Sequence, residues 1–386
     1  MPLDFQNLRP QLDAYVQQSH IWKKRIDTIM QQAVQVLREW SGKTEAIQTL
    51  IQQTAQSDPS LRCAVPTQES WMEFFPPSQQ DSVFHLLAAD GSQIYPDTHQ
   101  ALFFGLINIG SIIFPANSSD APKTEIKSAL LDLQETFTPN GIISEELLGL
   151  MRNVQERTYL ASQCTGLQGL TIALTDGPLE LYHEPKIDDA FQRLFSDYLQ
   201  ALQTLAQQHV IFAGYVDKPR ADLIVRTLEI LAGTQIPQSA ARPFAGLGDA
   251  NLLKSILPPK HRSAVMQIRS RSTASYMGEI ALHFFYLNVG NAHKPWIVRV
   301  EVPEYVSRNS QYLQLLHDTL LAQCQIMGAQ PYPYVLHRAH EIAVVRLAEK
   351  QELERMLWQH LEESGLHAGT TSPKQMAKNL SGRTRL

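Results

Sequence analysis

Cysteine is scarce in this sequence, and its placement excludes two ways of stabilising a fold. Cys63, Cys164 and Cys324 are odd in number, far apart and without any Cys-x-x-Cys spacing. A disulfide framework needs paired cysteines, and a structural zinc site needs closely spaced ligands. We therefore expect three buried thiols.

Long apolar runs are also missing. No stretch of the 386 residues is apolar over the roughly 20 positions that cross a bilayer, and Met1 to Arg9 lack a signal-peptide pattern. We expect a cytoplasmic protein with no membrane contact. The formal net charge of −5 gives no global sign of a nucleic-acid partner, so such a role has to rest on local patches.

The segments that are present alternate between strand and helix. Strands are predicted at 84–90, 101–114, 170–174 and 210–216, and helices at 145–163, with Ser144 as N-cap, and at 188–209. Alternation gives parallel neighbours in a sheet, whereas the first two strands form an antiparallel hairpin. The predicted fold class is therefore α/β, with a mixed central β-sheet flanked by helices.

Further patterns lie on either side of this region. Apolar residues recur at helical spacing from Leu12 to Gln56, with a break at Ser41-Gly42, which predicts an N-terminal helical extension. A turn-rich connector follows at 57–80. A second pair of strands is predicted at 276–289 and 296–302, and closing helices at 312–327 and 334–364.

Two aspartates stand where strands are expected to end. Asp90 follows the apolar run from Phe84, and Asp176 follows the run from Leu170, each before a glycine turn. If these strands lie side by side in one sheet, the carboxylates meet at one edge, where they repel unless a cation sits between them. The pattern predicts a hard-metal site.

Two further side chains are candidates for this site. Glu156, beside Arg157 on the predicted helix, is by itself typical of a solvated residue, but it can turn inward to complete a trio with the aspartates. Three carboxylates around one or two Mg²⁺ or Mn²⁺ ions suit phosphodiester hydrolysis. His340 is either structural, a softer metal ligand, or the group that protonates a leaving oxygen. Its spacing from His337 is not that of a zinc protease.

Five motifs in this order resemble the NurA family of nucleases. They are Asp-Gly-Ser at 90–92, the helix Glu156, Thr-Asp-Gly-Pro at 175–178, Gly-Tyr-Val-Asp-Lys-Pro at 214–219, and Tyr-Pro-Tyr at 332–334 followed by Ala-His at 339–340. The likeness runs from about Asp81 to about Leu347. Each motif alone is weak, whereas all five in family order are fairly specific.

The resemblance implies an RNase H-like core and a Mn²⁺-dependent nuclease, with Mg²⁺ as the alternative ion. It implies a 5′→3′ exonuclease and single-strand endonuclease that acts on DNA ends, as a homodimer, with a hexameric HerA-type ATPase in end resection for double-strand break repair. Asp90, Glu156 and Asp176 would be catalytic, metal-binding carboxylates, and His340 the late catalytic and metal-binding histidine. The family's catalytic tyrosine is not placed, because both candidates, Tyr215 and Tyr276, are more typical of core tyrosines.

Together with the patterns on either side of it, the extent of this resemblance predicts three parts. Residues 1–80 would form the N-terminal helical extension and connector, and residues 81–365 the nuclease domain. Residues 366–386 are rich in Thr, Ser, Lys and Arg and are expected to form a flexible C-terminal tail.

A nuclease must also hold a polyanion. The segment 254–271 carries several basic residues and no acidic one, which predicts sequence-independent, salt-sensitive phosphate contacts, although a solvated charged face has the same composition. The residues predicted to bind DNA are Lys218, Lys254, Lys260, Arg262, Arg269 and Arg271. Weaker candidates are the tail residues Lys374, Lys378, Arg383 and Arg385, and, as stacking surfaces for bases, Phe284, Phe285 and Tyr286.

These residues favour one of three function classes. The first is a metal-dependent DNA nuclease, favoured because all three carboxylates and His340 are present. The second is a catalytically silent dimeric adaptor or regulator of a DNA-translocating ATPase, which would keep the fold without turnover. The third, a sugar-kinase-like or actin-like ATPase, is disfavoured because no phosphate-cradling glycine loop is recognisable.

Overall fold

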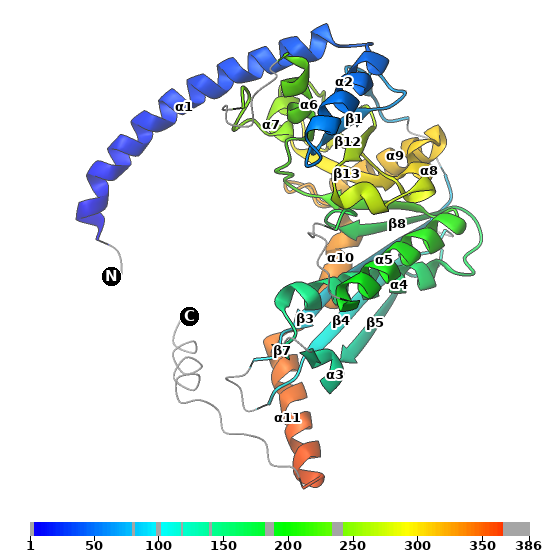
Figure 1. Cartoon of the computed structure of the whole chain (residues 1–386). Helices are drawn as coiled ribbons and strands as arrows, with labels where there is room; N and C mark the ends of the chain where they lie inside the picture. Colours follow the sequence, from blue (N-terminus) through cyan, green and yellow to red (C-terminus); the bar gives the residue numbers. More distant parts are fainter. Residues whose placement is uncertain are drawn as a thin grey trace. The chain divides into compact units, whose positions relative to one another are not determined.

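The computed structural model describes residues 4–78, 82–97, 102–116, 119–138, 141–181, 189–233 and 242–365 (Figure 1). These residues form two compact units. The first unit comprises the described parts of Met1–Asp81, Gly177–Glu184 and Ala213–Pro331, and the second those of Ser82–Asp176, Pro185–Phe212 and Tyr332–Leu386. In the described part of the chain, no helix combines the length and the apolar character needed to cross a membrane.

Two helices open the first unit. They are α1 (Phe5–Glu39) and α2 (Thr44–Ser57), and the side chain of Asp4 caps the start of α1. Gly42, at φ 77°, takes the left-handed conformation that separates the helices, at the predicted break. The buried residues of α1 lie in its C-terminal half and are Ile29, Ala33 and Leu37. The predicted N-terminal helical extension is confirmed.

An antiparallel sheet forms the centre of the first unit. Its order is β1-β11-β12-β13-β9, where β1 is Cys63–Pro66, β11 Met266–Arg269, β12 Leu282–Asn288 and β13 Ile297–Pro303; β9 is Ile211–Val216, of which the residues from Ala213 on belong to this unit. Two short strands, β2 (Phe74–Phe75) and β10 (Arg262–Ser263), pair with each other, and β10 also pairs with β12. The helices of this unit are completed by α6 (Leu223–Leu231), α7 (Asp249–Lys254), α8 (Glu304–Ser307) and α9 (Ser310–Ile326).

Some predictions for the first unit were wrong. The strand expected from Tyr276 begins only at Leu282, and two 3-10 turns, η1 (Ser272–Ser275) and η2 (Gly278–Ile280), precede it. The connector expected at 57–80 contains β1 and β2. Every residue of β12 is buried, so the aromatic side chains of this strand offer no surface for stacking bases; they are Phe284, Phe285 and Tyr286.

A mixed sheet forms the centre of the second unit. Its order is β8-β3-β4-β5, where β3 is His85–Ile94, β4 Leu106–Phe114, β5 Lys123–Leu130 and β8 Thr171–Asp176. β3, β4 and β5 pair antiparallel, and β8 pairs parallel to β3. Between β5 and β8 run α3 (Leu133–Thr136), the hairpin of β6 (Phe137–Thr138) and β7 (Gly141–Ile142), and α4 (Glu145–Cys164).

The connectivity of the second unit is the one expected of an RNase H-like core. Three antiparallel strands are followed by α4, then by a strand parallel to the first, and then by α5 (Asp189–Gln207). Ser144 caps α4 as predicted, because its hydroxyl accepts the backbone N–H of Leu147 at 3.1 Å. The predicted α/β fold with a mixed central sheet flanked by helices is confirmed.

Helices cover both faces of this sheet. On one face lies α4, where a side chain at Gly91 would meet Arg152. On the other lies α10 (Tyr334–Ala343), whose backbone would meet a side chain at Gly110. Because neighbouring residues of a strand alternate between faces, and Gly110 pairs with Asp90, the side chain of Asp90 lies on the α10 face.

Two predictions for the second unit were wrong. β3 continues through Asp90 and Gly91 to Ile94, so Asp90 is inside a strand and the Gly-Ser pair makes no turn. The closing helix expected at 334–364 is two helices, α10 and α11 (Leu347–Glu363). The break occurs because Val344 is extended and side chains of the sheet bind the carbonyl of Ala343.

The three cysteines are free and buried, as predicted. Burial raises the pKa of Cys63 to about 11 and that of Cys164 and Cys324 to about 12. The thiols therefore stay protonated at neutral pH and are poor nucleophiles or metal ligands.

Two predictions about the organisation of the chain stay predictions. The tail at 366–386 and its basic residues lie outside the described residues. The division into an extension at 1–80 and a nuclease domain at 81–365 stays a prediction.

Candidate functional site

Two aspartates lie beside each other on neighbouring parallel strands. β3 pairs in parallel with β8, with Ala89 opposite Thr175. Asp90 and Asp176 are the next residues along these strands, so the register puts them side by side. Their side chains share the face of the sheet that α10 covers, because residues in register on adjacent strands point the same way.

Helix α10 brings a histidine to the first aspartate. Nδ1 of His340 lies 2.7 Å from Oδ2 of Asp90, while Oδ1 of Asp90 accepts the backbone N–H of Gly91 at 2.8 Å. The side chain of Asp90 is 17% exposed and that of His340 is 63% exposed. The pair therefore combines a largely covered carboxylate with an imidazole that solvent and solutes can reach, which suits proton transfer.

A tyrosine contacts the second aspartate. The hydroxyl of Tyr332 donates to Oδ1 of Asp176 at 2.9 Å, and Tyr332 directly precedes Pro333, the N-cap of α10. In the sequence Tyr332 belongs to the Tyr-Pro-Tyr motif, which predicts no particular contact for it. The two residues are 156 positions apart, so spacing alone carried no signal of this contact.

Glu156 is held by a different set of contacts. It is 3% exposed; its Oε1 accepts the Thr175 hydroxyl at 2.5 Å and lies 2.7 Å from Nη1 of Arg157. Burial raises the pKa of the Glu156 carboxyl, and the charge of Asp90 adds to this, whereas Arg157 and Thr175 act in the opposite direction. Glu156 is therefore turned inward rather than solvated, and its contact with Thr175 was not predicted from the sequence.

The four predicted metal ligands do not form one cluster. Within the described ranges, no group of three or more His, Cys, Asp or Glu side chains is arranged to hold a metal ion. Asp90 contacts His340, Asp176 contacts Tyr332, and Glu156 has its own partners. The donor chemistry nevertheless fits a hard divalent cation, because the set offers carboxylate oxygens and one imidazole. Both Mn²⁺ and Mg²⁺ accept such oxygen ligands.

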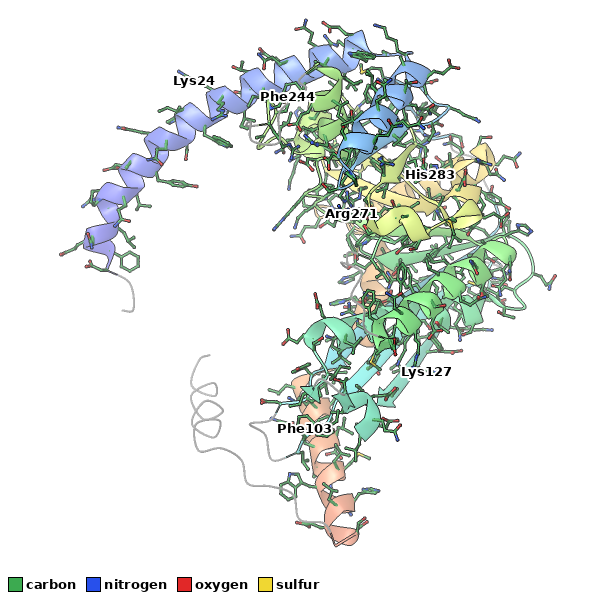
Figure 2. The ribbon with its side chains drawn as sticks, viewed as in Figure 1. Lys24, Phe103, Lys127, Phe244, Arg271 and His283 are labelled. Carbon is green, nitrogen blue, oxygen red and sulfur yellow. The ribbon has the colours of Figure 1, made fainter. Side chains whose placement is uncertain are left out.

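The residues predicted to bind DNA differ in exposure. The exposed ones on the first unit are Lys218, Lys254, Lys260 and Arg271, the last of which is labelled in Figure 2. Arg269 is half-buried. The ammonium group of Lys218 lies 5.4 Å from the ring centre of Trp296, and its φ of 50° is unusual for a residue other than glycine.

The structure corrects the prediction that Arg262 binds DNA. It is 4% exposed, and its guanidinium forms two hydrogen bonds with the carboxylate of Glu69, at 2.7 and 2.8 Å. It also lies 3.9 Å from the ring centre of Phe75. A buried, bidentate ion pair leaves no charge for a phosphate, so Arg262 contributes to the core of the first unit instead.

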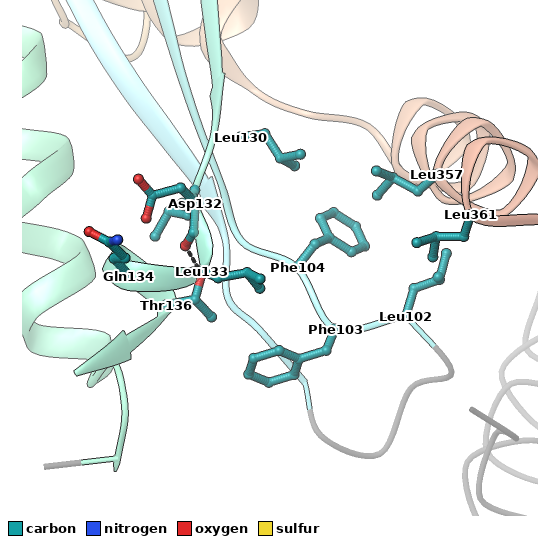
Figure 3. Close-up of a pocket in the computed structure, with 11 residues that line it drawn as sticks. Leu102, Phe103, Phe104, Leu130, Asp132, Leu133, Gln134, Thr136, Leu357 and Leu361 are labelled. Atoms are coloured by element: carbon teal, nitrogen blue, oxygen red, sulfur yellow. Dashed lines mark hydrogen bonds between the residues drawn. The ribbon is translucent and has the colours of Figure 1, made fainter. Parts of the chain in front are cut away.

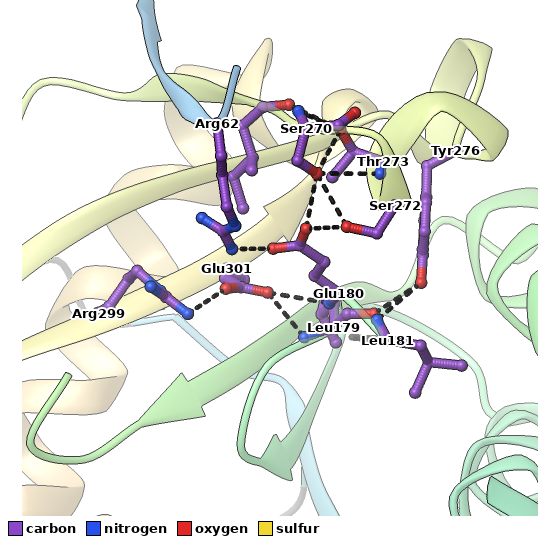
Figure 4. A network of polar contacts seen from close by, with 11 residues as sticks. Arg62, Leu179, Glu180, Leu181, Ser270, Ser272, Thr273, Tyr276, Arg299 and Glu301 are labelled. Carbon is purple, nitrogen blue, oxygen red and sulfur yellow. Dashed lines mark hydrogen bonds and ion pairs between the residues drawn. The ribbon is translucent and has the colours of Figure 1, made fainter. Parts of the chain in front are cut away.

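The two candidates for a catalytic tyrosine are both buried in the first unit. The hydroxyl of Tyr276 donates to the carbonyl of Leu179 at 3.2 Å and accepts the N–H of Leu181 at 3.0 Å (Figure 4). The hydroxyl of Tyr215 lies 3.6 Å from the sulfur of Cys324. Both contacts are typical of core tyrosines, the interpretation that the sequence favoured.

A buried polar network surrounds Tyr276 (Figure 4). The carboxylate of Glu180 pairs with Arg62 and accepts the hydroxyls of Ser270 and Ser272 at 2.7 and 2.5 Å. Glu301 accepts the backbone N–H groups of Leu179 and Glu180 and pairs with Arg299. The network holds the backbone at 179–181, so its charged groups have structural partners.

An open pocket of about 690 Å³ lies elsewhere in the second unit (Figure 3). Its lining is mostly apolar and includes Phe103, Phe104, Leu133 and Leu357. The acidic residue among its lining is Asp132, which caps α3. The described residues of its lining include no second titratable group, which chemistry at a phosphate would need.

Comparisons with known proteins bear on this geometry. The family model described as NurA domain matches residues 84–345. Among solved structures, the NurA nuclease from Sulfolobus solfataricus is similar, with a TM-score of 0.51, 12% sequence identity, and coverage of 75% of this chain and 88% of that chain. At this identity the likeness shows a shared fold.

Further structures match less well. A NurA crystal structure with manganese has a TM-score of 0.39 and 10% identity, and covers 74% of this chain and 91% of that chain. The catalytic domain of human endonuclease V has a TM-score of 0.32 and 10% identity, and covers 81% of this chain and 98% of that chain. No curated protein matches the sequence.

Proposed function

The chain belongs to the NurA family, whose domain spans residues 84–345, and we propose that it is a nuclease that hydrolyses phosphodiester bonds in DNA with the help of a divalent metal ion. The observation that carries the proposal is the side-by-side placement of Asp90 and Asp176 on parallel strands, with His340 in contact with Asp90. Two adjacent carboxylates repel each other, and a bound cation removes this repulsion.

The proposed metal ligands are Asp90, Asp176, Glu156 and His340. When bound, a divalent ion polarises the phosphate and lowers the pKa of a bound water. Mn²⁺ is the proposed ion, and Mg²⁺ is the alternative, since carboxylate oxygens bind both. A structure of this family with manganese exists, which agrees with the proposal.

The protein's own groups have separate roles in the proposed reaction. Asp90 holds Nδ1 of His340, so Nε2 of this exposed imidazole either binds the ion or exchanges a proton with the leaving or attacking oxygen. Tyr332 orients Asp176. Thr175 and Arg157 fix the buried carboxyl group of Glu156 in place and oppose the upward effect of burial on its pKa.

DNA would be held through its phosphates. The exposed residues Lys218, Lys254, Lys260 and Arg271 are the proposed contacts, with Arg269 in a lesser role because it is half-buried. These contacts would not read sequence, so single strands and duplex ends would both bind.

The finer proposals rest on the family. We propose 5′→3′ exonuclease and single-strand endonuclease activity by a cytoplasmic homodimer. Its working partner would be a hexameric HerA-type ATPase, and its role DNA end resection in double-strand break repair.

The test is cleavage of end-labelled linear DNA, single-stranded and duplex, by the purified protein with Mn²⁺, Mg²⁺ or EDTA. We compare the wild type with Asp90→Ala and Asp176→Ala, and use Asp197→Ala, an exposed aspartate on α5, as the matched control. We expect metal-dependent cleavage by the wild type and the control and none by the two site variants, with folding checked by circular dichroism.

Two outcomes would contradict the proposal. Cleavage by both site variants at the wild-type rate would place the chemistry elsewhere. Absence of cleavage with every metal, even after addition of a cognate HerA-type ATPase, would instead support the silent adaptor of a DNA-translocating ATPase.

A further inference from the structure

The last turn of α10 is bound to the sheet by side chains. The carbonyl oxygen of Ala343 accepts the hydroxyl of Ser92 at 2.5 Å and the side-chain amide of Asn108 at 2.8 Å. The final carbonyls of a helix have no partner within the helix, so these donors satisfy a group that would otherwise be unpaired. Ser92 and Asn108 are direct partners in the register of β3 and β4.

The amide of Asn108 is itself held in one orientation. Asn108 is 6% exposed, and its Oδ1 accepts the hydroxyl of Ser128, on β5, at 2.6 Å. With the oxygen engaged by Ser128, the nitrogen is left to face Ala343. Three strands therefore contribute to the position of the end of α10.

A glycine lets the helix come close to the sheet. A Cβ atom at Gly110 would lie 2.5 Å from the backbone nitrogen of Ala343 and 2.8 Å from the carbonyl carbon of Ile342. Both are backbone atoms, so any side chain there has to displace α10. Gly110 is also the residue paired with Asp90, two positions along β4 from Asn108. The missing side chain thus permits a close approach directly opposite the aspartate.

We propose that Ser92, Asn108 and Gly110 are positioning residues that place His340 against Asp90. His340 lies three residues before Ala343, on the last turn of the same helix. A shift of that turn therefore moves the imidazole of His340 relative to the sheet. The inference rests on the proposed function, because it gives these residues their effect through a catalytic histidine.

The first test measures cleavage by Gly110→Ala and the milder Ser92→Ala. We expect kcat to fall about a hundredfold in Gly110→Ala, since a displacement of about 1 Å can have this effect, and about tenfold in Ser92→Ala, with KM for DNA unchanged. The control is Gly149→Ala in α4, where the new Cβ meets nothing within 4 Å and activity should stay at the wild-type level. If kcat in Gly110→Ala and Ser92→Ala falls only in proportion to the fraction of folded protein, then both residues have a merely structural role.

The second test uses a double-mutant cycle. If Gly110 acts through His340, then Gly110→Ala should cause no further loss in a His340→Ala background. The same fold-loss with and without His340 would overturn the proposal.

The inference can also be tested if the proposed function fails. Histidine ¹H–¹⁵N spectra at fixed pH report the ring nitrogen of His340, assigned by the signal that disappears in His340→Gln. This signal should move in Asp90→Asn and move in the same direction in Ser92→Ala and Gly110→Ala. If the wild type cleaves no DNA, the proposed function is refuted while the spectra still decide the positioning. An unmoved signal in both Ser92→Ala and Gly110→Ala would refute the positioning role.

Discussion

The contact between Thr175 and Glu156 gives a quantitative prediction. The hydroxyl of Thr175 is fully buried and donates to the Glu156 carboxylate at 2.5 Å. Thr175→Val removes this donor and keeps the branched shape of the side chain. The carboxylate is buried on α4, so no water replaces the lost hydrogen bond without a rearrangement.

The size of the effect follows from the type of hydrogen bond. A hydrogen bond to a charged group contributes about 1.5 to 3 kcal/mol. Thr175 lowers the pKa of Glu156 against the upward effect of burial, so its loss favours the protonated acid. A metal ion competes with that proton, and the affinity for Mn²⁺ should therefore fall by about tenfold to about 150-fold.

The assay is a titration with Mn²⁺ at pH 7, with free Mn²⁺ measured by electron paramagnetic resonance and cleavage measured in parallel. Thr171→Val is the matched control, because Thr171 lies on the same strand and the same face and is 5% exposed. The control should bind Mn²⁺ as the wild type does.

An unchanged Mn²⁺ affinity in Thr175→Val, with the protein folded, would refute this reasoning. It would mean that Glu156 is no ligand, or that Thr175 does not influence its ionisation. A similar loss in Thr171→Val would show that the effect comes from packing in β8.

Other predictions concern stability and DNA binding. Burial lowers the pKa of His317 from 6.5 to about 4, so stability should fall by about 3 kcal/mol as the pH falls from 6.5 to 4, and His317→Gln should abolish this fall in urea unfolding. Burial raises the pKa of Asp249 from 3.8 to about 6, so its contribution to the free energy of unfolding is full below pH 3.8 and is lost as the pH rises through 6. This pH dependence is opposite in sign to that of His317, and Asp249→Asn should remove it in the same urea unfolding assay. Lys254→Gln and Arg271→Gln should each reduce the salt dependence of duplex binding by about 0.9 in log–log slope, and unchanged slopes would exclude the phosphate contacts. Arg262→Gln should leave that slope unchanged but lower the free energy of unfolding by about 3 kcal/mol, because it breaks a buried ion pair.

The pairing of β3 with β8 shows which features of the candidate site could be predicted from the sequence. Two apolar strands that each carry an aspartate predicted adjacent carboxylates, and the parallel register places Asp90 beside Asp176. The roles of these residues and of His340 stay predictions. The contacts of Tyr332 and Thr175 were not predicted, because a hydroxyl has no spacing or periodicity that reveals its partner.

Local pattern by itself determined many of the elements of this protein, but not β1 and β2 within the predicted connector. Ser144 marks the start of α4, Gly42 separates α1 from α2, and apolar patterns predict β3, β4, β8, β9, β12 and β13, because each of these signals acts within a few residues of the chain.

The tertiary structure alone decided the rest, because the deciding contacts join residues far apart in sequence. The helix expected at 334–364 ends at Ala343, since Ser92, 251 positions away, binds its carbonyl. Arg262 is buried because Glu69, 193 positions away, pairs with it. Both outcomes depend on which side chains the folded sheet brings within hydrogen-bond distance, and a pattern read along the chain contains no such information.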